Sequence, residues 1–292
     1  MKRAVRDLVS ILGLAVLSSL SGCAQAKLPV DVSTHGGEID HLWWLITWIT
    51  GTAFFATELL LVYCIFKFRH KDGARAAHVH GHLRLELTWT TVTALILATL
   101  AVYQISAWRT AKMPDFDQIR RDGALEVQVF AKQFEWNFRY KDKEGEFTIA
   151  SPPGELAIPV NRDIIFEMRS ADVLHSLFMP QLRFKQDLVP GTRIFQWVKA
   201  TRTTKQQREM LKDPDFKFEI ACAELCGPNH RQMQGIVHIL DQADFDARLA
   251  EWSRFAPPEI WEDGNWDEKG LSYSDLALKK RKAKADHPKS ED

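Results

Sequence analysis

Two long apolar runs stand out in the first third of the chain. Residues 41–68 read HLWWLITWITGTAFFATELLLVYCIFKF, and residues 83–108 read LRLELTWTTVTALILATLAVYQISAW. At about 1.5 Å of helix rise per residue, each run can cross a hydrocarbon core roughly 30 Å thick. The second run is polar at its start and apolar from Val92 to Val102. We therefore predict two antiparallel transmembrane helices joined by the loop 69–82.

From Leu125 onward the pattern changes to a period of two. Short segments rich in Val, Ile and aromatic residues are separated by turn signals such as SPPGE and VPGT, which is typical of an all-β sandwich or barrel. The segments are LEVQVFA, FEWNFRY, DIIFEM, IFQWVKA, FKFEIA and GIVHIL. A closing stretch, DQADFDARLAEWSRF, has an Asp start signal and amphipathic spacing, which predicts a helix. We place this domain at 124–256, after a linker at 109–123 and before a polar tail at 257–292.

The N-terminal residues have the pattern of an export signal. Lys2, Arg3 and Arg6 precede a short apolar stretch and then small residues, which is the order found in secretory signals. The segment Leu20-Ser21-Gly22-Cys23 resembles the lipobox of bacterial lipoproteins. That resemblance implies a signal peptide at 1–22 and a lipid on Cys23; the alternative is an uncleaved signal anchor with an incidental cysteine.

The charged loop between the apolar runs predicts the topology. Arg69, Lys71 and Arg75 lie in the segment 69–82, and the positive-inside rule places such a loop in the cytoplasm. The segment 23–40 and everything after residue 108 are then outside. A lipidated start agrees with this topology, so we predict a multi-pass protein of a bacterial inner membrane with its C-terminal domain in the periplasm.

Composition and single residues add little to this picture. The 292 residues carry a formal net charge of zero, which argues against a nucleic-acid partner. Glu58 lies within the first apolar run, where an ionisable group indicates a buried partner or a functional role. Cys64, in the same run, is interpreted as an inert packing residue.

The segment CAELCGPNHRQM, residues 222–233, concentrates metal-binding chemistry. Cys222, Cys226 and His230 recur every four residues, and Met233 follows three further on. In an outside domain a disulfide or a thiol-exchange pair is the first alternative, but neither uses the His and the Met. Zinc accepts Cys and His but has no need of Met. Thiolates, imidazoles and a thioether suit copper, and two cysteines suggest two copper ions bridged by both sulfurs.

A second imidazole is expected from His175. This residue lies in SADVLHSLFMPQLRFKQDLVPG, at a strand-to-loop junction well before the cysteines. Cupredoxins take their copper ligands from that arrangement, with one His early and the others in a late loop. A single His is more often a surface or core residue, but together with the later segment it is interpreted as a ligand.

At these residues the chain resembles a known family. DVLHS, LVPG and CAELCGPNHRQM are similar to subunit II of haem-copper cytochrome c oxidases, and the resemblance covers about residues 38–255. The pattern C-x-E-x-C-x-x-x-H-x-x-M is specific because six positions agree at fixed spacing. The implied fold is a transmembrane helix hairpin followed by an all-β, cupredoxin-like Greek-key domain outside the membrane.

The resemblance also implies a dinuclear copper centre, CuA, and its ligands. Two cysteines bridge both coppers, two histidines supply one imidazole each, a methionine is a weak axial ligand, and a glutamate ligates through its backbone carbonyl. Carried over, the ligands are His175, Cys222, Glu224, Cys226, His230 and Met233. In family members the side chain of that glutamate faces a magnesium or manganese site at the boundary with subunit I, so Glu224 is a candidate for both roles.

The implied function is electron transfer in an aa3-type-like oxidase. Subunit II accepts electrons from cytochrome c and passes them to the haem of subunit I, where oxygen is reduced to water with proton translocation. Subunit III is a further partner. LELTW resembles the family segment E-x-x-W, in which the glutamate lies near the mouth of a proton pathway. Glu86 and Trp89 match that segment, whereas Thr93 replaces the family's proline.

The region where electrons enter departs from the family pattern. The family reads Q-W-x-W, and this chain reads Gln133-Phe134-Glu135-Trp136, so Phe134 occupies the position of the first Trp and Trp136 that of the second. Phenylalanine is much harder to oxidise than tryptophan, which leaves the donor in question and not the copper centre. Asp172 and Asp187 flank His175 and are predicted to attract a basic donor.

Three alternative functions fit the sequence less well than a cytochrome c oxidase subunit. A quinol oxidase subunit lacks copper ligands, whereas this chain keeps all of them. A CuA subunit of a nitric oxide reductase is the nearer alternative. A membrane-anchored copper chaperone or thiol redox protein comes from a different class, but its family has CxxxCP and a thioredoxin-like fold, whereas Gly227 follows the second cysteine here. No C-x-x-C-H occurs, so the chain has no c-type haem of its own.

Overall fold

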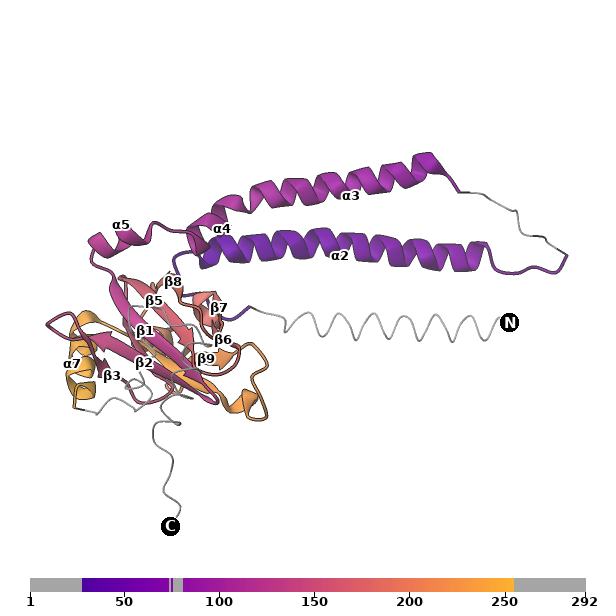
Figure 1. Ribbon diagram of the computed structural model, residues 1–292. Helices are drawn as coiled ribbons and strands as arrows, with labels where there is room; N and C mark the ends of the chain where they lie inside the picture. Colours follow the sequence, from indigo (N-terminus) through magenta and orange to yellow (C-terminus); the bar gives the residue numbers. More distant parts are fainter. Residues whose placement is uncertain (1–27, 74, 76–80, 255–292) are drawn as a thin grey trace, which may run out of the picture. The chain divides into compact units, whose positions relative to one another are not determined.

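The computed structural model describes residues 28–73, 75 and 81–254 (Figure 1). The predicted signal peptide at 1–22, the lipidation site Cys23 and the tail 257–292 therefore lie outside the described residues. The predicted fold class, a helix hairpin followed by a β-domain, is confirmed.

The two apolar runs form the helices α2 (Gly36–Lys67) and α3 (Leu83–Tyr103). Both are long and apolar enough to cross a membrane. α2 begins five residues before the predicted start at residue 41, and Glu38 in its first turn suits the positive end of the helix dipole. The predicted second helix is interrupted at Gln104 and continues as α4 (Ile105–Lys112).

Threonine hydroxyls inside these helices have backbone partners. Thr47 donates to Trp43 O at 2.7 Å, and Thr93 donates to Trp89 O at 2.8 Å. Such bonds to the preceding turn satisfy hydroxyl groups that face an apolar solvent. Thr93, which replaces the family's proline, therefore sits in an unbroken helical turn.

The β-domain contains ten strands. Six coincide with the predicted segments, and β3, β4, β6 and β7 are additional strands of four or five residues. The strands are β1 (Leu125–Lys132), β2 (Glu135–Lys141), β3 (Phe147–Ala150), β4 (Glu155–Pro159), β5 (Asp163–Ser170), β6 (His175–Met179), β7 (Phe184–Leu188), β8 (Ile194–Lys199), β9 (Phe218–Cys222) and β10 (Gln234–Leu240).

The strands form two five-stranded sheets, ordered β3-β2-β1-β5-β8 and β4-β10-β9-β6-β7. Both sheets are mixed, because β1 pairs parallel with β5 and β10 pairs parallel with β4. Their inner faces bury a core of large side chains that includes Trp136, Phe138, Phe166, Ile158 and Phe218. Tyr140 links the two sheets, since its hydroxyl donates to Ala157 O at 3.0 Å and accepts from Ala157 N at 2.9 Å.

Short helices and 3-10 turns complete the domain. α5 (Phe116–Arg121) lies within the predicted linker, and α6 (Thr204–Leu211) begins with a capping box formed by Thr203 and Gln206. The predicted last helix is α7 (Gln242–Trp252), where Asp241 is the N-cap residue but makes no side-chain capping bond. There are also two 3-10 turns in the described residues. η1 (Pro180–Leu182) follows β6, and η2 (His230–Gln232) lies near the end of the cysteine segment, residues 222–233.

Candidate metal centre

Neighbouring strands bring the early histidine to the late cysteine segment. His175 begins β6, Cys222 ends β9, and the two strands pair antiparallel with Leu177 opposite Cys222. The chain then turns through residues 223–229 and η2 before it enters β10. Residues 47 positions apart in sequence therefore meet at one end of the second sheet.

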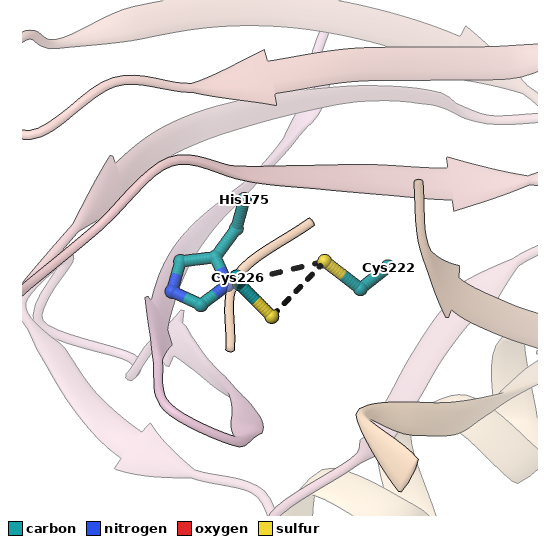
Figure 2. A group of neighbouring side chains, drawn as sticks. All are labelled: His175, Cys222 and Cys226. Atoms are coloured by element: carbon teal, nitrogen blue, oxygen red, sulfur yellow. Dashed lines mark hydrogen bonds between the residues drawn. The ribbon is translucent and has the colours of Figure 1, made fainter. Parts of the chain in front are cut away.

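The two cysteine sulfurs lie side by side and are not bonded to each other. Cys222 Sγ lies 3.8 Å from Cys226 Sγ, and both cysteines are free. A disulfide has its sulfurs about 2.05 Å apart, so this pair is reduced. Figure 2 shows both sulfurs facing each other beside the ring of His175. The ligand atoms of these three residues lie within 4.8 Å of one another.

Each sulfur has its own imidazole. Nδ1 of His175 lies 3.9 Å from the Cys222 sulfur, and Nδ1 of His230 lies 3.5 Å from the Cys226 sulfur. The remaining two predicted donors divide in the same way. Glu224 O lies 3.2 Å from Cys222 Sγ, and Met233 Sδ lies 3.9 Å from Cys226 Sγ. The structure thus brings together all six residues that the sequence predicted as ligands.

A carboxylate fixes the orientation of the first histidine. Asp172 Oδ1 lies 2.8 Å from Nε2 of the buried His175 and also accepts from Val173 N, while Asp172 Oδ2 accepts from Gln133 N at 2.7 Å. An ionised carboxylate can only accept, so Nε2 carries the proton and the lone pair of Nδ1 faces the sulfurs.

A second support comes from the loop that follows β1. Gln133 Nε2 donates to Cys226 O at 2.5 Å. Gly227 has φ of +138°, and a Cβ placed there would lie 2.8 Å from Gln133 Nε2 and 3.0 Å from Phe134 Cζ. The glycine therefore lets the cysteine segment and the β1–β2 loop approach each other closely.

The cysteines differ in their tendency to ionise. Burial disfavours the thiolate of Cys222, but the contact with the His175 ring and hydrogen bonds with the backbone outweigh it and lower the pKa of this thiol to about 6. Burial and the neighbouring Cys222 sulfur raise the pKa of the Cys226 thiol. Two adjacent thiolates repel each other, so a cation between them is needed before both can be deprotonated.

The donor set matches a soft metal centre better than the alternatives do. The cysteines expose only 8% and 3% of their surface, and Met233 is completely buried. A thiol-exchange enzyme needs an accessible thiolate, and structural zinc sites use four Cys or His ligands without a thioether. Two sulfurs, two imidazoles, a thioether and a carbonyl suit a pair of copper ions.

The other residues singled out in the sequence lie in different settings. Phe134 is half-buried beside Gly227, whereas Trp136 is fully buried with its ring centroid 6.2 Å from that of His175. Asp187 pairs with Lys185 at 2.8 Å. Two membrane-helix acids, Glu58 in α2 and Glu86 in the first turn of α3, are exposed, and Cys64 is half-buried.

The sequence did not indicate three supporting residues. The first two are Gln133 and Gly227, which lie far apart in the sequence and meet in the fold. The third is Asp172, which was predicted only as a surface acid that attracts an electron donor. Its carboxylate contacts His175 instead. The spacing of Asp172 and His175, three residues apart, was the one available signal. An Asp and a His on a solvent-facing loop can have the same spacing, so the two cases can be distinguished only when the backbone conformation of the loop is known.

Comparison with known families gives a consistent result. The model for "Cytochrome C oxidase subunit II, periplasmic domain" matches residues 142–240, and the model for the transmembrane domain of the same subunit matches residues 21–106. The two matches together cover more than half of the chain. A protein with these two domains is anchored in a membrane and has its β-domain outside.

Curated relatives carry the same description. The alternative cytochrome c oxidase subunit 2 of Bradyrhizobium diazoefficiens is 29% identical over 77% of this chain and 84% of its own length. Cytochrome c oxidase subunit 2 of Alkalihalophilus pseudofirmus is 33% identical over 78% of this chain, which spans 63% of that relative. The cytochrome c oxidase subunit 2 of Synechocystis sp. is 27% identical over 81% of this chain.

Solved structures of related proteins resemble parts of the chain, and two serve as examples. The periplasmic domain of subunit II of cytochrome oxidase (CoxB) of Bradyrhizobium japonicum covers 44% of this chain and 94% of its own, at 23% identity and a TM-score of 0.36. A chain of a heme-copper terminal oxidase dimer covers 53% of this chain and 99% of its own, at 19% identity and a TM-score of 0.37. By its two family matches and its curated relatives, the chain belongs to the family of cytochrome c oxidase subunit II.

Proposed function

We propose that this subunit II holds a dinuclear copper centre, CuA, and is the electron-accepting subunit of an aa3-type-like cytochrome c oxidase. The observation that carries the proposal is the pair of reduced sulfurs 3.8 Å apart, each with its own imidazole. We assign the copper ligands to six residues: His175, Cys222, the carbonyl of Glu224, Cys226, His230 and Met233. As an oxidase subunit, the chain works within an oxidoreductase complex, and the oxygen chemistry belongs to its haem-containing partner.

When bound, the centre supplies a one-electron redox couple shared between two metals. The protein's contribution is to hold the donors in one arrangement, so that the geometry of the centre changes little when the centre gains or loses an electron. His175 is fixed by Asp172, and the cysteine segment is fixed by the bond from Gln133 to Cys226 O. Burial of Cys222, Cys226 and Met233 excludes water from the three sulfur donors.

The curated relatives make the alternatives less favourable. They are described as cytochrome c oxidase subunits, which disfavours a nitric oxide reductase subunit. The burial of both cysteines disfavours a copper chaperone or thiol redox protein, because such proteins present an accessible thiol to a partner.

We place the approach of a c-type cytochrome at the β1–β2 loop. Phe134 is half-buried there and contacts the segment that contains Cys226, so it is the aromatic residue between solvent and the sulfurs. Trp136 lies deeper, against His175. Asp172 uses both oxygens within the site, so we assign it to positioning His175, and Asp187 remains the acid proposed for the docking surface.

The remaining assignments follow from family membership. We propose that α2 and α3 both span the membrane, with the loop 69–82 in the cytoplasm and a lipid anchor on Cys23. The side chain of Glu224 is assigned to a magnesium or manganese site at the boundary with subunit I. Glu86 is assigned to the mouth of a proton pathway, and subunit III is a further partner.

The proposal is tested on the full chain, purified in detergent and loaded with copper. We expect two coppers per chain and an electron paramagnetic resonance spectrum in which one unpaired electron couples to both. Cys222→Ser and Cys226→Ser should each abolish that spectrum. A single copper with a mononuclear spectrum, or a Cys222–Cys226 disulfide with no copper bound, would refute the proposal.

A further inference from the structure

A small cavity lies where the two membrane helices join the β-domain. It has a volume of about 170 Å³ and is lined by the start of α2, the end of α4 and the strands β7 and β8. Trp197 Nε1 donates to Thr110 O at 3.0 Å, and the ring of His35 packs edge-on against Trp197 with centroids 4.6 Å apart. These contacts fix the positions of the side chains on one side of the cavity.

The cavity contains a cation, Lys112, that forms no salt bridge among the described residues, although it lies near enough to Asp187 to feel its charge. Lys112, the last residue of α4, donates to Lys185 O at 2.9 Å and to Gln186 Oε1 at 3.2 Å, and both of these acceptors are neutral. By contrast, Lys185 Nζ is 2.8 Å from a carboxylate oxygen of Asp187.

The third cation of the cavity is also paired. Arg183 forms a bidentate pair with Asp40, at 2.6 and 2.8 Å. With Lys185 and Arg183 each matched by one acid, the charge of Lys112 is in excess. Burial and the neighbouring charge of Lys185 lower the pKa of the Lys112 ammonium, and the charge of Asp187 opposes this shift only in part. An anion bound in the cavity would supply the missing negative charge.

The depth of the cavity identifies the source of that anion. Trp108 is 55% exposed and lies one helical turn before Lys112 on α4. Exposed tryptophans of membrane helices lie at the boundary between hydrocarbon and headgroups. Four residues of helix rise about 6 Å, and the headgroup layer is about 5–7 Å thick on each side of the hydrocarbon core. Lys112 is therefore at the level of the lipid phosphates.

We propose that this cavity binds the phosphate of an anionic membrane phospholipid, with Lys112 and Lys185 as the groups that contact it. A phosphodiester carries one negative charge, which matches the single excess positive charge. Trp108 and Met113, exposed apolar residues close to Lys112 in the chain, would contact the glycerol and acyl part of the same lipid. The site is separate from the sulfur cluster and does not depend on copper.

The test uses the full chain in a neutral detergent, with lipid binding measured by native mass spectrometry. Phosphatidylglycerol is titrated against phosphatidylcholine, and we expect one molecule of phosphatidylglycerol to bind with a preference of at least about fivefold. Lys112→Gln and Lys185→Gln should each weaken binding by about fivefold, as expected for the loss of one lysine near an anionic headgroup. Lys112→Arg should retain binding, and Lys205→Gln, which removes an exposed lysine on α6, is the matched control.

Two results would overturn the proposal. One is equal binding of phosphatidylglycerol by the wild-type chain and both glutamine variants. The other is complete displacement of the lipid by inorganic phosphate alone, which would make the cavity a site for a free anion. Circular dichroism of each variant checks folding. The described contacts of the Lys185 side chain are limited to Asp187, so Lys185→Gln keeps the test valid if Lys112→Gln fails to fold.

Discussion

Asp172 Oδ1 lies 2.8 Å from Nε2 of His175, while Nδ1 of the same ring lies 3.9 Å from the sulfur of Cys222. The carboxylate and the sulfur therefore hold the two ring nitrogens in different roles. Nε2 carries the proton and donates a hydrogen bond to Asp172, and Nδ1 keeps its lone pair for a metal. An acid that looks like a surface charge in the sequence is part of the support of the site.

Asp172→Asn should weaken copper binding. The asparagine keeps the shape of the side chain but removes the charge that favours Nε2 protonation, and loss of such a partner typically lowers metal affinity by 10–100-fold. Competition with a copper chelator measures the change, and the electron paramagnetic resonance spectrum shows whether the sharing of the electron is altered. Asp187→Asn, which changes an acid on the neighbouring strand β7 that pairs with exposed Lys185 and makes no contact with a copper donor in the described structure, is the control and should leave copper affinity unchanged. Equal affinities of Asp172→Asn and the wild-type chain would remove Asp172 from the support of the site.

Gly227→Ala should destabilise the domain more than Gly123→Ala. Both glycines have positive φ, +138° and +88°, so both substitutions incur backbone strain, but only at Gly227 does a new Cβ meet Gln133 and Phe134 at 2.8 and 3.0 Å. Crowding of this kind costs about 1–3 kcal/mol. Denaturant unfolding of the metal-free chain measures the difference between the two variants. If both lose the same stability, the contact with Gln133 and Phe134 has no energetic weight.

Most of the candidate ligands could be predicted because they lie close together in the sequence. The spacing of Cys222, Cys226, His230 and Met233 identified the late segment, the strand-to-loop setting of His175 pointed to a second imidazole, and resemblance to a family added Glu224. The antiparallel pairing of β6 with β9 then explains why residues so distant in sequence meet. Nothing in the local pattern of either strand specifies this pairing, so the sequence alone supplied the donors and not their arrangement.

The missed strands have a different cause. β3, β4, β6 and β7 contain four or five residues each, too few for alternation to be distinguished from chance. β4 also follows the turn SPPG and ends at Pro159, and such residues usually signal loops. Their strand character comes from pairing with partners such as β10 and β9, which is a property of the tertiary structure.

Tyr140→Phe should lower the unfolding free energy by about 1–3 kcal/mol. The hydroxyl bonds both Ala157 N and Ala157 O, so its loss leaves a buried donor and a buried acceptor unsatisfied. Tyr103→Phe is the matched control, because Tyr103 is exposed and its hydroxyl lies 3.5 Å from His41. Thermal or denaturant unfolding compares the two variants. A loss within about 0.5 kcal/mol for Tyr140→Phe, the range of ordinary surface changes, would contradict the role of this residue in joining the sheets.

The β2–β3 turn should make stability depend on pH through Asp142. Its carboxylate accepts from Glu144 N, Glu146 N and the hydroxyl of Thr148 at 2.6–3.0 Å. The bonds from Thr148 and the backbone lower the pKa of Asp142 below its ordinary value of 3.8. A carboxyl whose pKa is lower in the folded state stabilises the fold above the ordinary pKa, and this contribution disappears as the pH falls through the folded-state pKa.

The comparison of wild type with Asp142→Asn tests this. The difference in unfolding free energy between the two should be constant from neutral pH to about pH 5 and should shrink as the pH falls below about 4. A gap between wild type and Asp142→Asn that stays constant down to about pH 2 would show that the charge of Asp142 has no part in the turn.

Phe134→Ala should slow electron uptake from a c-type cytochrome without changing the copper centre. Phe134 is half-buried and its ring lies against Gly227, so we expect a donor that docks at the β1–β2 loop to contact this ring. Aromatic residues at the centre of a docking surface often contribute about 2 kcal/mol or more to binding, which corresponds to a rise in KM of at least about tenfold. Steady-state oxidation of cytochrome c by the assembled oxidase measures the effect, with copper content as the check on the centre. Phe147→Ala, on the far strand β3, is the control. An unchanged KM for Phe134→Ala, at full copper content, would mean that electrons enter by another surface.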